Sequence, residues 1–588
     1  QNGNTIINVS NSIFQSSSSA KEVLSKSPGV IITNGEISVV GSGTALIYVG
    51  RNLITYTAMQ AIPVSQIESV EVIKNPDASY EASGKAVILV HLKELGLEGF
   101  QGKVLSHYTK AFYQLGYLDF SLNWHKNKLS VSASGNTNIG ATGSIRIDSL
   151  NAPNLEQPYQ ANSDFNEKVL LNHVSNFLVG AKYQLSPKHD ISVEYNGNRS
   201  FYELNVNTDI QQNFENNTKT IQALNRGTSL WSTDVLSANY QWKIDSLGSR
   251  LFIGATYSAV SKDYADKINE TANYNLEETI SNSTSESDNL NLLKIGQIDY
   301  TKVFANTSKL KIGLKHTTSH SSTAVRLNTL SNDSLINNIN NSYNYQEQIN
   351  AGYINWKSKW KKGYYEIGTR LEHTTAIANK EAETVNYIDT TYLGVFPNLN
   401  FTTQLKKWTL SEKFNAKISR PNFGEITPYI YYLNAFTAVL GNPEIRPSYI
   451  YNFEHQFSNK KWETNINLGL NHEKSPKLFV IFQNDSATTD NTISVVNLKR
   501  HDQLYFEVGQ GVNVKGITGY NMVNISLNRI EDDNLNFGEI GISPKFYFYS
   551  YTKFPIKKWF NFELLGSYTS QYSDGRRVLQ PAGELGLL

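Results

Sequence analysis

The stretch "YLDFSLNW", Tyr117–Trp124, carries the pattern that decides the fold of this chain. Its apolar side chains fall at every second position, at Leu118, Phe120, Leu122 and Trp124. The residues between them are polar, and a period of two predicts a β-strand with one apolar and one polar face. The same alternation returns at Phe177–Leu185, Ile191–Tyr195 and Trp462–Leu470, so we expect most of the chain to be β.

The composition agrees with a β-protein and narrows the classes of function. The chain has 34 Tyr against 2 Met, and aromatic residues are favoured in strands. A net charge of +1 gives no sign of nucleic-acid binding. The absence of Cys excludes disulfides, a thiolate nucleophile and a Cys-based zinc site. No run of about 18 apolar residues predicts a membrane helix, but a β-barrel crosses a membrane with alternating strands of about ten residues.

Nine short turns, most of them with lysine, separate the alternating segments. They lie at Lys126–Lys128, Ser186–Asp190, Asp245–Arg250, Asn306–Lys309, Lys357–Gly363, Leu405–Trp408, Ser458–Trp462, Asn513–Gly516 and Phe554–Trp559. Longer polar stretches, which we interpret as loops, include Asp263–Asn291, Asn328–Asn350 and Thr375–Asp389. Short turns at one end and long loops at the other are typical of an outer-membrane barrel. A large periplasmic or secreted β-protein is the alternative, because alternation alone also fits a soluble sandwich.

The turns also predict the number of strands. Two strands for each of the nine turns, one near Gln101–Ala111 and one after Tyr568 give twenty strands in this chain. Barrels of this kind normally have even strand numbers, and about 22 strands leave a lumen that needs a plug. We therefore expect a mainly β fold: an antiparallel transmembrane β-barrel of about 22 strands, whose last strands lie beyond Leu588 because an open edge in lipid is costly.

A compact unit precedes the barrel. Ser19–Leu92 alternates strand-like and helix-like segments, and "IESVEVIKNPDASYEASGKAVILVHLK", Ile67–Lys93, holds two strand-like runs around a turn. Pro76 initiates that turn, and Gly84 permits positive φ. We expect a small α/β domain that fills the lumen. The expected division is an extended segment at 1–18, a plug at 19–100 and the barrel, incomplete at its C-terminus, at 101–588.

Two motifs resemble a known family. Val23–Val30, Ala45–Arg51 and Ile67–Ile88 resemble the plug domain of TonB-dependent receptors. Ser419–Glu454 resembles a stretch of the outer-membrane β-barrel branch common in Bacteroidota. The plug motif comprises Pro28, Gly29, Gly50, Arg51, Ile67, Glu68, Glu71, Asn75, Pro76, Tyr80 and Gly84. The barrel motif comprises Arg420, Pro421, Pro428, Gly441, Asn442, Pro443 and Pro447. We expect structural roles for all of them.

The chain also departs from the family pattern. Val49-Gly50-Arg51 stands where the family usually has Asp-Gly-Arg, and Lys85–Val90 lacks the second Gly and the Asn of the usual Gly-Gly-Val-Ile-Asn-Ile. Gln1–Gln15 holds no convincing TonB box. Its apolar residues suit either a coupling strand or the first strand of the plug, and we favour the plug strand.

No residue pattern predicts catalysis, a cofactor or a metal. His316 and His320 would stand about 13 Å apart on a strand and lack the Glu of the metalloprotease motif. Glu531–Asn534 lacks the ligand spacing of a calcium loop. We interpret Ser281–Asn289 as flexible extracellular loop, and the aromatic runs Tyr429–Leu433 and Lys545–Tyr551 as interfacial girdle. We expect no enzyme.

The resemblance implies uptake across a bacterial outer membrane, with ligand capture by extracellular loops and gating by the plug. The partners it implies are TonB, outer-membrane lipid and lipopolysaccharide, and no nucleic acid. The altered motifs keep a second class open. In this alternative the chain is a non-transporting accessory or structural barrel in an outer-membrane assembly, secretion or surface-lipoprotein complex, with a surface lipoprotein or other complex subunits as partners.

Overall fold

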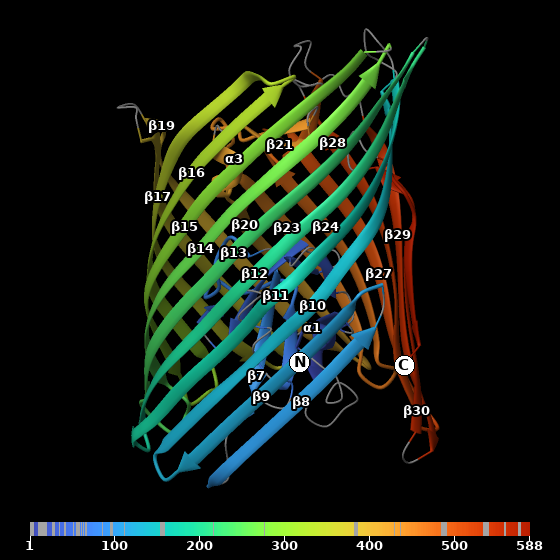
Figure 1. The fold of residues 1–588 in the computed structure, drawn as a ribbon. Coiled ribbons are helices and arrows are strands. Elements are labelled where there is room, and N and C mark those ends of the chain that lie inside the picture. The colour runs from blue at the N-terminus through green and yellow to red at the C-terminus, as the bar shows by residue number, and fades with distance from the viewer. Residues whose placement is uncertain are drawn as a thin grey trace.

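The molecule is a tall β-barrel with a small domain in its interior (Figure 1). This computed structural model describes residues 5–587 except 10–19, 26, 28–29, 34–35, 40–42, 51, 55–58, 60–61, 63, 65–66, 85, 94–97, 111, 153–158, 216, 276, 382–385, 428–429, 435–436, 484–490, 533–539, 558–559 and 574–577. No helix within the described residues has the length and apolarity that a membrane span requires.

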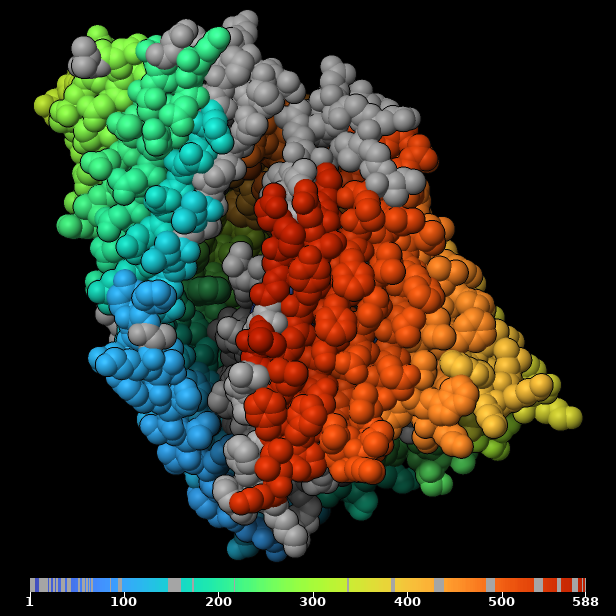
Figure 2. Space-filling model, turned by 90° about the vertical axis from the view of Figure 1, so that its right-hand side faces the viewer, coloured from blue at the N-terminus to red at the C-terminus, as the bar shows by residue number. Residues whose placement is uncertain are grey.

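Twenty antiparallel strands form the closed barrel, which is the number expected for this chain. They are β8 (Gly99–Lys110), β9 (Gln114–Lys126), β10 (Leu129–Ala152), β11 (Tyr159–Ser186), β12 (His189–Phe214), β13 (Thr218–Lys243), β14 (Arg250–Tyr274), β15 (Glu277–Val303), β16 (Lys309–Ser331), β17 (Ser334–Trp360), β18 (Gly363–Lys380), β19 (Asn386–Leu405), β20 (Trp408–Ser419), β23 (Ser448–Asn459), β24 (Thr464–Lys474), β27 (Arg500–Val514), β28 (Ile517–Glu531), β29 (Ile540–Lys557), β30 (Phe560–Thr569) and β33 (Ala582–Leu587). Eight of the nine short turns lie where the sequence predicts them, and the ninth falls at residues 558–559, between β29 and β30 and outside the described residues. The first and last barrel strands run along the same side of the molecule (Figure 2). Strands beyond Leu588 stay a prediction.

The two faces of the barrel wall follow the alternation in the sequence. On β9, the four apolar side chains from Leu118 to Trp124 are 37% to 45% exposed. Asp119, Ser121 and Asn123 between them are buried. The apolar face therefore points outward to lipid and the polar face points into the lumen, which confirms the expected faces. Inside, amide side chains bond across neighbouring strands, with Asn176 donating to Asn136 at 2.9 Å and Asn198 donating to Asn176 at 2.8 Å.

The wall is tallest from β10 to β17, where strands have 23 to 28 residues. About ten residues suffice to cross a membrane, so these strands continue far beyond it. The long polar stretches expected as loops are therefore mostly strand, and Ser281–Asn289 lies within β15, paired with β14 and β16. The loop interpretation was wrong because cross-strand pairs, such as Thr323 donating to Asn289 at 2.7 Å, hold polar residues in a sheet without apolar alternation.

The domain in the lumen is a seven-stranded sheet, with the helix α1 among its described residues. It contains β1 (Thr5–Asn8), α1 (Ala20–Ser25), β2 (Val30–Thr33), β3 (Glu36–Val39), β4 (Gly43–Val49), β5 (Asn52–Ile54), β6 (Ile67–Ile73) and β7 (Ala86–Leu92). Its core joins Val23 and Leu24 of α1 to Ile67, Val70 and Ile88 of the sheet. β1 pairs with β6, as expected for the first strand of the plug. The other domain limits stay a prediction.

A second, smaller sheet belongs to the segments that leave the barrel at its long-loop end. β21 (Ile430–Asn434) and β22 (Thr437–Leu440) come from the β20–β23 connection, and β25 (Lys477–Gln483) and β26 (Asn491–Asn497) come from the β24–β27 connection. β22 pairs in parallel with β26 and so joins the two connections. We call these four strands the loop sheet. The short helix α3 (Phe423–Ile426) precedes the loop sheet in the chain. Between β30 and β33, β31 (Tyr572–Ser573) pairs with β32 (Val578–Leu579).

Candidate functional site

The turn between β6 and β7 carries the plug's contacts with the barrel wall. Asn415 of β20 donates to the side chain of Asn75 at 2.5 Å, and the Ile418 backbone N–H donates to the Ala82 carbonyl at 3.1 Å. On β16, Lys311 pairs with Asp77 at 2.7 Å. The same turn that the sequence identifies as a plug motif is therefore the segment that attaches the plug to the barrel.

A chain of alternating charges continues from this turn into the wall. Glu81 pairs with Lys315 of β16 and with Arg370 of β18, the latter at 3.4 Å. Arg370 then pairs with Glu372 at 2.5 Å, and Arg420 pairs with Glu372 at 2.6 Å. Arg370 and Glu372 are 2% and 1% exposed, so these charges depend on each other rather than on water. The chain of charges links the plug turn to Arg420 of the barrel motif.

The electrostatics of the plug turn keep its carboxylates charged. Burial alone would raise the pKa of Glu81, but Lys315 and Arg370 lower that pKa to about 2. Burial likewise opposes ionisation of Asp77, but the charge of Lys311 and its hydrogen bond hold the pKa of Asp77 well below its ordinary value. Both carboxylates are therefore ionised at neutral pH, and the plug turn is held as an anion among wall cations.

A second anchor lies at the end of β6. Lys74 pairs with Glu507 of β27 at 2.7 Å. Burial lowers the pKa of Lys74, but the charges of Glu507 and Glu454 raise it by more. The pKa of Lys74 therefore lies above its ordinary value. Glu454 itself pairs with Lys413 at 2.9 Å and accepts a hydrogen bond from Tyr505. The plug is thus attached along an arc of the wall from β16 to β27.

The plug motif residues fall in three groups. Ile67, Pro76 and Gly84 are buried, Asn75 and Tyr80 are half-buried, and Glu68 is exposed. Tyr80 packs edge-on against Tyr48 at 5.1 Å, and Glu71 lies 3.3 Å from His91. Gly50 forms the β4–β5 turn with φ +59°. Pro28, Gly29 and Arg51 lie outside the described residues.

Gly84 is favoured for a reason other than the one expected. It is not among the described glycines with positive φ. A Cβ at this position would meet the Leu46 side chain at 2.7 Å, so a larger residue would require Leu46 of β4 to move. The expectation of positive φ was wrong because a turn motif does not reveal what packs on the turn.

The barrel motif organises the entrance to the loop sheet. Asn422 and Glu425 form a capping box on α3 just after Arg420 and Pro421, and Lys477 of β25 pairs with Glu425 at 2.6 Å. Asn442 donates to the Val495 carbonyl at 3.0 Å and accepts from the Glu444 N–H at 2.9 Å. A Cβ at Gly441 would meet the Thr427 carbonyl oxygen at 2.1 Å. Pro443 and Pro447 are half-buried, and Pro428 lies outside the described residues.

A cavity of about 330 Å³ lies between the loop sheet and the wall. Its lining includes Lys477, Leu478, Gln503, Asn528, Lys545 and Tyr572. Gln503 is on the same face of β27 as Glu507, which contacts the plug, so the cavity is on the lumen side. The Lys545 ammonium stands 4.2 Å from the centre of the Tyr572 ring. Cations, amides and apolar side chains line a volume that suits a small polar ligand.

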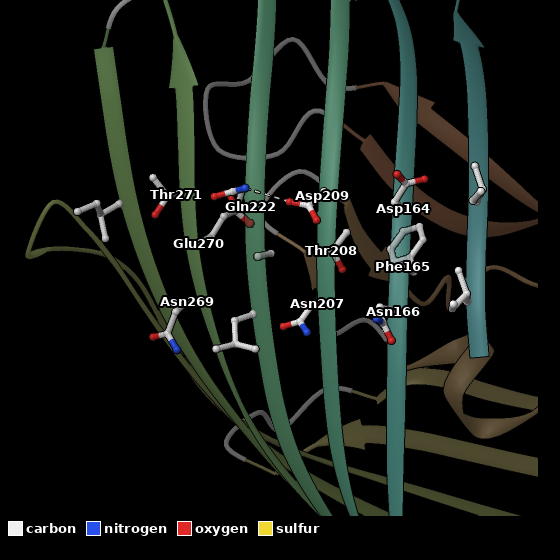
Figure 3. A pocket seen from close by; sticks show the side chains of 15 residues that line it. Asp164, Phe165, Asn166, Asn207, Thr208, Asp209, Gln222, Asn269, Glu270 and Thr271 are labelled. Carbon is white, nitrogen blue, oxygen red and sulfur yellow. Dashed lines mark hydrogen bonds between the residues drawn. The ribbon is translucent and has the colours of Figure 1, made fainter. Parts of the chain in front are cut away.

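A larger hollow of about 830 Å³ lies higher on the wall, over β10 to β15 (Figure 3). Asn207 and Asp209 face it from β12, and Gln222 of β13 donates to Asp209 at 3.1 Å. These two β12 residues share the strand face of the exposed Ile191 and Val193, so the hollow is on the outer side of the wall. It makes no contact with the plug residues described above.

The structure also places the aromatic run of β29 and His316, both of which the sequence analysis considers. The aromatic run from Lys545 to Tyr551 was expected in the interfacial girdle, but Tyr547, Tyr549 and Tyr551 are buried in the lumen beside Ile31 of the plug. That expectation was wrong because aromatic residues occupy both faces of β29, and alternation alone does not tell which face meets lipid. His316 is exposed and lies 2.8 Å from Asn350.

Most of the residues that attach the plug were not predicted as site residues, with Asn75 as the exception. Asp77 and Glu81 lie inside the Ile67–Ile88 motif but are not among its named residues, and the wall residues Lys311, Lys315, Arg370 and Glu372 belong to no motif named from the sequence. One signal could have found the wall residues: charged side chains at lumen-facing positions, such as Arg370 and Glu372 two residues apart, need partners across the lumen.

The comparisons with known proteins agree with this architecture. The model of the outer membrane protein beta-barrel family matches residues 242–584. No curated protein matches in sequence. Among solved structures, the siderophore receptor PirA from Pseudomonas aeruginosa shares 13% identity at a TM-score of 0.57, with 100% of this chain and 92% of that chain covered. A mutant of the ferric enterobactin receptor PfeA from Pseudomonas aeruginosa shares 13% identity at a TM-score of 0.62, with 100% of this chain and 90% of that chain covered. The copper transporter OprC shares 11% identity at a TM-score of 0.62, with 100% of this chain and 89% of that chain covered.

Proposed function

Because the chain belongs to the outer membrane protein beta-barrel family, we propose that it is a TonB-dependent receptor that takes up a ligand through its plugged lumen. It resides in the bacterial outer membrane. The loop sheet and the cavity beneath it capture the ligand, and displacement of the plug opens the path inward. A periplasmic TonB protein supplies the displacement by gripping an extended segment of this chain.

The attachment of the plug turn is the observation that carries the proposal. Most of its contacts are hydrogen bonds and ion pairs, at Asn75, Asp77 and Glu81. The apolar part is one small cluster, in which Ala82 packs with Phe396, Ala416 and Ile418 of the wall. Polar contacts can exchange for water when the turn moves, whereas an apolar plug–wall interface would lose its stabilisation on wetting. The contacts are therefore suited to a plug that is held firmly and released reversibly.

A disulfide that locks the plug tests the proposal. Ala82 and Ile418 pack in one cluster and share a backbone hydrogen bond, which suits the Cα separation of a disulfide. The chain has no other cysteine, so only A82C/I418C can cross-link. We expect a gene-deletion strain with a nutrient-specific growth defect to be complemented by the reduced double variant and by either single variant, but not by the oxidised double variant.

The accessory-subunit function remains the second candidate because the plug departs from the family pattern at Val49 and at Lys85–Val90. It predicts a different result. A general envelope defect, complemented equally by the locked and unlocked proteins, would establish the accessory role and overturn uptake.

A further inference from the structure

Three consecutive turns at the periplasmic end of the barrel repeat the same residues. The β17–β18 turn has Trp360-Lys361-Lys362, the β19–β20 turn has Lys406-Lys407-Trp408, and the β23–β24 turn has Lys460-Lys461-Trp462. Their strands are successive neighbours in the barrel, so the turns are adjacent along one part of the rim. We call these six lysines and three tryptophans the lysine–tryptophan arc.

The lysines of the arc are charged and available. All six are exposed, and the structure gives none of their ammonium groups an acidic partner among its described residues. Lumen-facing lysines are different, since Lys311, Lys315 and Lys413 each pair with a carboxylate. The only acidic residue of the three turns is Glu463. A chain with a net charge of +1 thus concentrates unpaired positive charge at this rim.

The tryptophans place the arc at the membrane surface. Trp360 stacks on Phe401 with ring centres 5.5 Å apart, and both rings are exposed, at 39% and 42%. Trp408 packs edge-on against Trp462, which is 55% exposed. Phe401 shares the outward strand face of Leu399, so these rings lie on the lipid side of the wall. Exposed aromatic rings at strand ends settle at the level of lipid headgroups.

From this geometry we propose that the lysine–tryptophan arc binds the phosphate headgroups of anionic phospholipids in the periplasmic leaflet of the outer membrane. A lysine at this level can lay its aliphatic stem along the apolar belt while its ammonium reaches the headgroup layer. The tryptophan rings occupy the same interface. A lipid is the occupant that fits, because the arc follows the barrel's circumference, where lipid surrounds it, and combines phosphate-binding cations with rings that pack against acyl chains.

Lipid selectivity measured on the intact protein tests this proposal. The protein is placed in nanodiscs of equal phosphatidylglycerol and phosphatidylcholine, and native mass spectrometry counts the lipids that it retains. We expect the wild type to retain phosphatidylglycerol over phosphatidylcholine by about fivefold or more, the factor expected from one lysine at an anionic surface. In the variant K361Q/K362Q/K406Q/K407Q/K460Q/K461Q the ratio should fall to about one. High salt should lower the wild-type ratio because it screens exposed charge.

The control removes a lysine elsewhere on the outer surface. K267Q changes an exposed lysine of β14 that shares the outward strand face of Ile253 and Tyr257, away from the short-turn end, and should leave the ratio unchanged. Tryptophan fluorescence gives a second readout, since brominated phosphatidylglycerol should quench the wild type more than brominated phosphatidylcholine does, whereas the two lipids should quench the six-lysine variant equally. A wild-type ratio of one, or an unchanged preference in the six-lysine variant, would overturn the proposal. Uptake plays no part in either readout, so failure here is distinct from failure of the proposed function.

Discussion

Glu81 is the residue on which the attachment of the plug depends most. Its carboxylate is only 13% exposed and faces Lys315 and Arg370. E81Q leaves Lys315 buried without a counter-ion, which costs about 3–5 kcal/mol in comparable buried pairs. We expect the plug of E81Q to unfold at lower urea concentration in pulse proteolysis with trypsin. E68Q, at an exposed position of β6, should change the midpoint little. Equal midpoints for E81Q and the wild type would contradict the role of the pair.

The same residue predicts a pH dependence. Its pKa is lowered from the ordinary 4.5 to about 2, so the folded plug gains stability from ionised Glu81 above pH 4.5. That stability is lost as the pH falls from about 4.5 to about 2. The wild-type plug should therefore become sensitive to pepsin over this interval, and E81Q should lose part of that pH dependence. Asp77 contributes in the same direction because its pKa is also lowered.

Among the elements, the loop sheet depends on contacts between two separate connections. Asn442 bridges the Val495 carbonyl and the Glu444 N–H, and Val495 is buried against Ile426 and Ile445. N442A removes two hydrogen bonds, each contributing about 0.5–1.5 kcal/mol. We expect faster hydrogen exchange at β22 and β26, with the barrel strands unchanged. N340A on the exposed part of β17 is the matched control. Unchanged exchange at β26 in N442A would show that the parallel pairing holds without the bridge.

Across the molecule as a whole, the plug lies in the lumen, attached to the wall from β16 to β27 (Figure 1). Removing residues 5–92 should leave a polar channel, because the inner wall carries hydrogen-bonding side chains that water can solvate. We expect single-channel conductance in planar bilayers to rise well above that of the intact chain, with E68Q giving wild-type values. A deletion variant that conducts no better than the intact chain would mean that the wall or the loop sheet, and not the plug, closes the lumen.

Local patterns in the chain are enough to specify the barrel. Alternation with a period of two depends only on the pleat of a strand, so the amino-acid sequence alone assigns Leu118, Phe120, Leu122 and Trp124 to one face. The nine turns and the twenty strands follow from local residue types in the same way. The plug turn at Asn75 and Pro76 is also predictable, because turn chemistry is local.

The attachment of the plug and the height of the strands depend instead on contacts between distant segments. Glu81 meets Lys315 and Arg370 across separations of 234 and 289 residues, and no local pattern encodes such partners. The polar strands beyond the membrane resemble loops in sequence because they lack lipid-facing alternation, and their pairing comes from neighbouring strands. Gly84 resembles a turn glycine, yet its role comes from the Leu46 side chain packed against it, which a Cβ would displace. One cause is common to all three: local periodicity fixes the faces of a strand, whereas closure of the barrel around the plug selects the partners that meet across the lumen.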